Sequence, residues 1–117
     1  MPTLLFIYGT LHPNRAPREI ATAARRLIPV GPATIRGRLY NLGEYPGVIL
    51  NPTGPLVSGE LFTVPDAATL AALDAYEDFR PADPANSLFL RIETTATSPD
   101  GSAHLCWVYT YNLEPSN

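Results

Sequence analysis

A short turn near the amino terminus carries the residue types of an anion-binding loop. The apolar run Leu4–Ile7 predicts a buried strand, and it is followed directly by Tyr8, Gly9, Thr10 and Leu11. Gly9 can adopt backbone angles that a side chain would forbid. Such a turn leaves backbone N–H groups outside any sheet ladder, free to face a carboxylate or a phosphate. The sequence therefore predicts a ligand-binding loop here or, as for most Gly-Thr pairs after strands, a plain turn.

A glutamate stands where a predicted helix needs an apolar residue. The segment Asp66–Asp78 is typical of a helix with Asp66 as its N-cap, and its apolar stripe comprises Ala67, Leu70 and Leu73. Four residues after Leu73, the stripe reaches Glu77. Partial burial and the negative helix end would both raise the pKa of Glu77, as suits a general acid/base. The alternative is a helix that frays after Ala75 and leaves Glu77 in water.

One cysteine and two histidines limit the other chemistries. Cys106 lies in an apolar strand two residues from His104, which would allow a thiol and base pair. A buried structural cysteine is favoured, because cysteine is among the most often buried residue types. His12 and His104 are too isolated for a metal site. We therefore predict no metal, no other cofactor and no internal disulfide, which fits a reducing compartment.

The composition is that of one ordinary globular domain. The 117 residues suffice for one core, so 1–117 is predicted to form a single domain. Hydrophobic residues make up 45% and charged residues 16% of the chain, which argues against disorder. A net charge of -3 without a basic stripe argues against nucleic acid or an anionic membrane as partner. No apolar stretch approaches membrane-spanning length and the start lacks a basic leader, so a cytoplasmic protein is expected.

Two helices and several short strands must position these residues. The predicted strands are 3–8, 33–40, 47–50, 57–64, 87–97 and 103–112. Within 33–40 the buried face should comprise Ile35, Gly37 and Leu39. A first helix should open at Pro17, run over 18–27 and bury Ile20, Ala23, Ala24 and Leu27. Pro99–Gly101 predicts a hairpin turn. This order favours an α+β fold whose sheet curls towards a small barrel.

Four short motifs, in order, make the chain resemble a known family. They are Tyr8-Gly9-Thr10-Leu11, Gly37-Arg38-Leu39-Tyr40 with Gly43-Glu44-Tyr45-Pro46-Gly47, Val57-Ser58-Gly59-Glu60-Leu61-Phe62, and Leu73-Asp74-Ala75-Tyr76-Glu77. Together they resemble the γ-glutamylcyclotransferase-like superfamily over nearly the whole chain, most of all its γ-glutamylamine cyclotransferase and AIG2-like group. The resemblance implies a small curled mixed β-barrel flanked by two helices. It also implies that Tyr8–Leu11 is the substrate loop and Glu77 the catalytic acid/base.

The chain departs from the family pattern on either side of the proline-rich segment 80–86. Family members often carry a Tyr-x-Arg triplet, and the corresponding residues here are Phe89-Leu90-Arg91, which lack the hydroxyl. Asp78 replaces the glycine that commonly follows the glutamate. Asp74 and Asp78 are expected to point away from Glu77 into solvent. These departures bear on the choice of substrate.

Three further side chains are candidates for the pocket. Tyr8 and Tyr45 would form its walls, or else pack as core and turn aromatics. Arg91 would meet a substrate carboxylate or pair with Glu77, or else lie on the surface or pair across strands.

Two classes of function remain open. The resemblance implies an enzyme of transferase or lyase type that converts a γ-glutamyl amine, or a γ-glutamyl-masked intermediate, to 5-oxoproline and a free amine. The substrate's own α-amine would attack, and Glu77 would move the protons. The alternative is a non-catalytic relative that binds a small carboxylate or serves as an interaction module. Glu77 favours the enzyme, because a binding site gains nothing from a destabilised acid.

Overall fold

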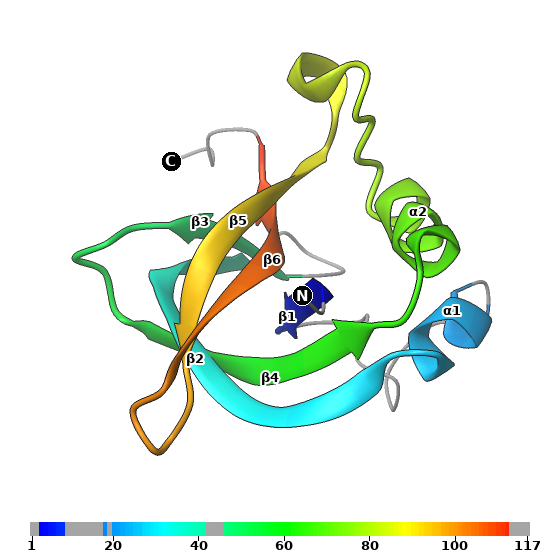
Figure 1. Cartoon of the computed structure of the whole chain (residues 1–117). Helices are drawn as coiled ribbons and strands as arrows, with labels where there is room; N and C mark the ends of the chain where they lie inside the picture. Colours follow the sequence, from blue (N-terminus) through cyan, green and yellow to red (C-terminus); the bar gives the residue numbers. More distant parts are fainter. Residues whose placement is uncertain (1–2, 9–17, 19, 42–45, 113–117) are drawn as a thin grey trace.

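The computed structural model describes residues 3–8, 18, 20–41 and 46–112. In chain order the elements are β1 Thr3–Ile7, α1 Ala21–Arg25, β2 Ile28–Asn41, β3 Pro46–Leu50, β4 Leu56–Val64, α2 Ala67–Tyr76, the 3-10 helix η1 Pro84–Asn86, β5 Phe89–Thr97 and β6 Ala103–Tyr111. Both α-helices lie on the same side of the strands (Figure 1).

Five strands close into a mixed barrel. β1 pairs with β4, β4 with β2, β2 with β3, β3 with β6, and β6 again with β1. The pairings of β6 with β1 and with β3 are parallel, and each has a single aligned pair, Leu5 with Trp107 and Val48 with Thr110. β5 pairs along the other side of β6 as a sixth strand. The predicted α+β fold with a small curled barrel is therefore confirmed.

Alternation along the strands creates two cores. In β1, Phe6 points into the barrel, whereas Leu5 and Ile7 point outward to the helices. The barrel core comprises Phe6, Ala33, Ile35, Val48, Val57, Leu61, Ala96, Cys106 and Val108. The helix-facing core comprises Leu5, Ile7, Ile20, Ala23, Leu27, Phe62, Val64, Leu73, Phe89 and Tyr109. The helices thus cover one outer face of the barrel, and α2 brings the polar residues Thr69 and Asp74 to that face.

β2 is longer than its pattern predicts. It begins at Ile28 instead of Ala33, and it passes a bulge between Pro29 and Gly31, where Gly31 has φ 150°. Prolines and a glycine read as loop residues, but this segment pairs with β4 through the bulge. Leu39 was predicted to be buried and is 49% exposed, because β2 has by then moved from β4 to pair with β3.

α1 has the predicted buried face but is short. Ile20, Ala23, Ala24 and Leu27 are all buried, as expected. The regular helix covers only Ala21–Arg25, and the predicted opening at Pro17 lies outside the described residues. Among the described residues, neither α-helix is long and apolar enough to cross a membrane.

The hairpin between β5 and β6 turns where it was predicted. Ser98 and Gly101 are joined by a hydrogen bond from the Gly101 N–H to the Ser98 carbonyl, at 2.9 Å. Gly101 has φ 89°, a conformation that favours glycine. The turn sets the antiparallel register in which Arg91 lies opposite Tyr109.

Candidate active site

The carboxyl-terminal end of α2 fixes the position of Glu77. The Asp78 N–H bonds the Ala75 carbonyl at 3.2 Å and the Phe79 N–H bonds the Asp74 carbonyl at 2.9 Å, the two bonds of a Schellman motif. Glu77 is the C-cap, so the helix ends one residue before it and does not fray at Ala75. Asp78 takes φ 56°, the left-handed conformation for which glycine is the usual residue.

The start of α2 also follows the prediction. The Asp66 carboxylate accepts a hydrogen bond from the Thr69 N–H at 2.8 Å, as expected of an N-cap. The buried stripe differs from the predicted one, because Ala67 is exposed and Thr69, Leu73 and Asp74 are buried. The stripe still leads to Glu77, which is half-buried.

Glu77 is a carboxylic acid in an unfavourable place for its charge. Burial raises the pKa of Glu77 from 4.5 to about 7. Among the described residues, none donates a hydrogen bond to its carboxylate, so nothing in this part of the chain offsets the desolvation. A group of this kind exchanges its proton near neutral pH.

The hydroxyl of Tyr8 joins two strands of the barrel. It donates to the Tyr109 carbonyl at 2.5 Å and accepts from the Val48 N–H at 3.1 Å. It therefore bridges β6 and β3 where these parallel strands share only one aligned pair. Burial raises the pKa of Tyr8, and the charge of Glu77 raises it further, which places Glu77 within electrostatic reach of this phenol. The described contacts of the Tyr8 hydroxyl are those of a barrel-closing residue.

A second polar cluster lies beside Glu77 and was missed in the sequence. Asp74 is buried, and its carboxylate accepts two hydrogen bonds from Arg91, at 2.8 Å and 3.2 Å. The Tyr109 hydroxyl donates to the same carboxylate at 2.7 Å. The prediction that Asp74 is solvated is therefore wrong. Asp74 precedes Glu77 by three residues, a spacing that puts both on one helix face, and this spacing was the available signal.

Arg91 occupies a site between aromatic rings. Its guanidinium carbon lies 4.5 Å from the ring centre of Trp107 and 5.5 Å from that of Phe79. These rings and the Asp74 carboxylate occupy the guanidinium, and the described contacts do not include the predicted pair with Glu77. Of the two alternatives for Arg91, the surface position is wrong, since its side chain is 16% exposed. The contact across strands is present, because Arg91 of β5 lies over the ring of Trp107 in β6.

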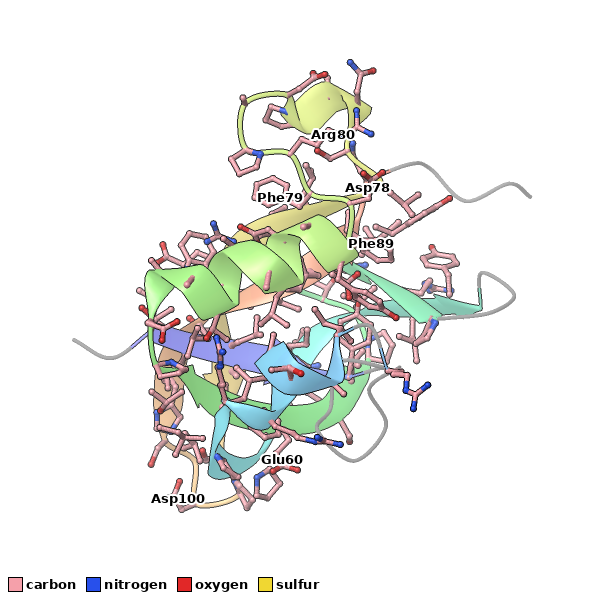
Figure 2. The ribbon with its side chains drawn as sticks, turned by 90° about the vertical axis from the view of Figure 1, so that its right-hand side faces the viewer. Glu60, Asp78, Phe79, Arg80, Phe89 and Asp100 are labelled. Atoms are coloured by element: carbon pink, nitrogen blue, oxygen red, sulfur yellow. The ribbon has the colours of Figure 1, made fainter. Side chains whose placement is uncertain are left out.

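The two departures from the expected motifs take clear places in the fold. Phe89 begins β5, is buried in the helix-facing core and packs edge-on against Tyr111. Figure 2 shows Asp78, Phe79 and Phe89 together at the end of α2, with Arg80 beyond them towards η1. Asp78 is about half exposed and pairs with Arg80 at 3.4 Å, so its predicted exposure is confirmed.

Four predicted site residues lie outside the described residues: Gly9, Thr10, Leu11 and Tyr45. Their described neighbours in the chain nevertheless converge. Tyr8, which leads into the predicted loop, is hydrogen-bonded to Val48, three residues after Tyr45. Tyr8 and the start of β3, which adjoin the two segments expected to contribute to the pocket, are therefore hydrogen-bonded neighbours.

The thiol of Cys106 is a packing group. Cys106 is buried in the barrel core, and burial raises its pKa to about 11. A thiolate is therefore disfavoured, which argues against a cysteine nucleophile. The described residues contain no group of three His, Cys, Asp or Glu side chains able to hold a metal ion.

Both phenols near Glu77 direct their protons elsewhere. Burial raises the pKa of Tyr109, and the hydrogen bond to Asp74 and the charge of Glu77 raise it further. The Tyr109 hydroxyl donates a hydrogen bond to the Asp74 carboxylate, and the Tyr8 hydroxyl donates one to the backbone carbonyl of Tyr109. In the described part of the chain, therefore, neither phenol donates a hydrogen bond to Glu77.

Several solved structures share this fold. An AIG2-like protein from Mus musculus superposes with a TM-score of 0.77 at 24% identity, covering 97% of this chain and 80% of the mouse protein. A structure described as a gamma-glutamyl cyclotransferase superposes with a TM-score of 0.68 at 17% identity, covering 95% of this chain and 67% of that one. YkqA from Bacillus subtilis gives 0.71 at 20% identity, with 96% of this chain on 36% of YkqA.

Sequence comparison assigns the family. No curated protein matches this chain significantly. The family model described as gamma-glutamyl cyclotransferase, AIG2-like, matches residues 5–117, which include most of β1, all of α2 and all the polar groups described above. The chain therefore belongs to the AIG2-like gamma-glutamyl cyclotransferase family.

Proposed function

We propose that this protein is a cyclotransferase that converts a γ-glutamyl amine, or a γ-glutamyl-masked intermediate, to 5-oxoproline and a free amine. The observation that carries the proposal is the half-buried carboxylate of Glu77, which titrates at about 7 and lacks a donor among the described residues. Family membership supports the reaction class. The Asp74–Arg91 pair and the neutral phenols around Glu77 support its use as a proton carrier.

The reaction needs no nucleophile from the protein. The α-amine of the substrate attacks its own γ-carbonyl carbon, a C–N bond forms, and the bond to the leaving amine breaks. Holding the amine and the carbonyl together removes an entropic barrier, and well-oriented partners reach effective molarities of about 10⁵ M or more. In the proposal, backbone N–H groups of Gly9, Thr10 and Leu11 hold the α-carboxylate, while Tyr8 and Tyr45 shape the walls.

Two proton transfers remain, and Glu77 is proposed to perform both. Its carboxylate takes a proton from the α-ammonium group, which makes the amine nucleophilic. The resulting carboxylic acid then gives that proton to the departing amine. As the lactam forms, the attacking nitrogen loses a second proton, which the regenerated carboxylate takes up and passes to the free amine, so that the amine leaves as an ammonium ion. A pKa of about 7 suits both steps, because neither protonation state is strongly preferred at neutral pH. In the proposal Arg91 acts through Asp74 and does not bind the substrate, because its guanidinium is already paired with the Asp74 carboxylate.

The test is release of 5-oxoproline from a panel of γ-glutamyl amines, measured by mass spectrometry. We expect turnover by the wild type and a loss of about 10²-fold or more in Glu77→Gln, because an amide cannot carry the proton. The wild-type rate should also fall as the pH drops below about 7, where Glu77 becomes protonated. Thermal melts of both proteins control for folding.

Two results would decide against the proposal. Full activity in folded Glu77→Gln would exclude Glu77 as the proton carrier. No turnover by the wild type on any γ-glutamyl amine would favour the other function, a non-catalytic relative that binds a small carboxylate. Calorimetric titration with a γ-glutamyl ligand would then measure that binding directly.

A further inference from the structure

Four sets of polar groups could change the proton affinity of Glu77. The charge of Glu77 acts on Tyr8, which directly follows β1, and on Tyr109 of β6. Asp74 lies one turn earlier on the same helix and holds Arg91 of β5. Beyond the helix, Asp78 and Arg80 pair in solvent, where their side chains are 48% and 60% exposed.

The positive charge of Arg91 compensates the negative charge of Asp74 and so weakens the repulsion between Asp74 and Glu77. Two carboxylates at a spacing of three residues on one helix face repel each other when both are ionised. Two hydrogen bonds from the guanidinium, at 2.8 Å and 3.2 Å, place an opposite charge directly on Asp74. The rings of Trp107 and Phe79 keep the guanidinium in that position. The helix face that carries Glu77 therefore has one unbalanced carboxylate instead of two.

The same pair determines where the proton of Tyr109 goes. The Tyr109 hydroxyl donates to the Asp74 oxygen that also accepts from the Arg91 Nε, at 2.7 Å and 2.8 Å. An ionised carboxylate held by Arg91 is a strong acceptor, so it keeps the hydrogen bond that the Tyr109 hydroxyl donates. A hydroxyl has one proton to donate, and Tyr109 therefore has none for Glu77.

We propose that Asp74 and Arg91 form a positioning pair for Glu77, which directs the Tyr109 proton away from it and leaves its carboxylate free for the substrate ammonium group. The role of the pair in turnover rests on the proposed function, whereas its effect on the protonation of Glu77 does not. Loss of the Asp74 charge alone leaves the positive Arg91 unbalanced and weakens the acceptor that holds the Tyr109 hydroxyl. Both changes stabilise the ionised form of Glu77.

The measurement is the pKa of Glu77 itself, followed by NMR of the protein labelled with carbon-13 at the glutamate carboxyl groups. Glu77→Gln assigns the signal. In Asp74→Asn we expect the pKa of Glu77 to fall by about 1 or more. In the double variant Asp74→Asn/Arg91→Gln, which removes both charges, it should return to within about 0.5 of the wild-type value.

Asp78→Asn is the matched control, because it removes the same charge one residue from Glu77 but leaves the pair intact. Its effect should stay below about 0.5, since Asp78 is exposed and screened. If the pair had a purely structural role, the pKa of Glu77 would change by the same amount in the single and in the double variant. An equal pKa of Glu77 in Asp74→Asn and the wild type would overturn the proposal, as would an equal fall in the double variant.

Tyr109→Phe tests the direction of the phenol proton and keeps the ion pair. If Tyr109 donates only to Asp74, the pKa of Glu77 should change by less than about 0.5 in this variant. A rise of about 1 would mean that Tyr109 donates to Glu77 in the wild type, and the proposal would be wrong. None of these titrations needs a substrate, so an inactive wild type would contradict the proposed function while the pKa values still decide this inference.

Discussion

At the scale of single residues, Glu77 differs from the other acidic residues that the structure describes, because burial disfavours its charge. It is the C-cap of α2, and its charge acts on the phenols of Tyr8 and Tyr109. Asp74, one turn earlier, is buried too but has Arg91 and Tyr109 as partners. The two carboxylates differ because Asp74 accepts hydrogen bonds and Glu77 accepts none from the residues that the structure describes.

The raised pKa of Glu77 makes stability depend on pH. Unfolded Glu77 titrates near 4.5 and folded Glu77 near 7, so the folded protein holds the proton more tightly. The resulting stabilisation is full below 4.5 and is lost as the pH rises through about 7. Removing the group should therefore make the protein relatively more stable at high pH.

We expect Glu77→Gln to melt close to the wild type at pH 5 and above it at pH 8. The shift corresponds to an upper limit of about 3 kcal/mol in the free energy of unfolding. Thermal or urea unfolding of both proteins across this pH range is the measurement. A difference that does not grow with pH would show that Glu77 is solvated in the fold.

Cys106 should behave as a small apolar residue. Cys106→Ala leaves a small space in the barrel core, so we expect a loss of about 1 kcal/mol in stability. Turnover should be unchanged, because the thiol faces the barrel core and its pKa of about 11 disfavours a thiolate. Urea unfolding and the 5-oxoproline assay measure the two effects. Inactivity of a fully folded Cys106→Ala variant would reopen the case for a cysteine nucleophile.

At the scale of elements, the end of α2 is the feature that positions the site. Its two capping hydrogen bonds require a left-handed residue after Glu77, and Asp78 adopts that conformation at φ 56°. A residue with a Cβ pays a steric penalty there, and a carboxylate is also unfavourable at the negative end of a helix. Asp78 therefore adopts the left-handed conformation that glycine would adopt without strain.

Replacement of Asp78 should reveal that strain. We expect Asp78→Gly to be more stable than Asp78→Ala by about 1 kcal/mol, because only glycine removes the steric cost. Both variants lose the exposed pair with Arg80, so the comparison cancels that contribution. Chemical denaturation of the two variants is the measurement. Equal stabilities would mean that the backbone at this position relaxes without cost.

At the scale of the whole molecule, the barrel closes through β6 with few aligned pairs. Each parallel pairing of β6, with β1 and with β3, has one such pair in the described residues. The Tyr8 hydroxyl adds a donor and an acceptor between β3 and β6. The residue that leads into the predicted substrate loop therefore also holds the barrel together.

Tyr8→Phe should weaken that closure. The Val48 N–H and the Tyr109 carbonyl would lose their partner, and we expect a loss of about 1–3 kcal/mol in stability. Tyr111→Phe is the matched control, since its hydroxyl has no hydrogen-bond partner among the described residues; it should cost less than about 0.5 kcal/mol. Thermal melts measure both. Equal melting temperatures for the two variants would contradict a closing role for Tyr8.

The local elements could largely be predicted from the sequence. The N-cap at Asp66, the buried face of α1, the hairpin at 98–101 and the approach of Glu77 to the core all depend on spacing within a few residues. Local hydrogen bonds and hydrophobic periodicity determine such features. The four ordered motifs likewise sufficed for the family, which the match over 5–117 confirms.

Only the tertiary structure decided which polar groups meet. Asp74 and Arg91 are 17 residues apart and Tyr8 and Tyr109 are 101 apart, so no local pattern joins them. Closure of the barrel brings β1, β5 and β6 beneath α2, where burial makes each unpaired polar group costly and selects its partner. For the same reason the bulged start of β2, which reads as a loop, became a strand once β4 lay beside it.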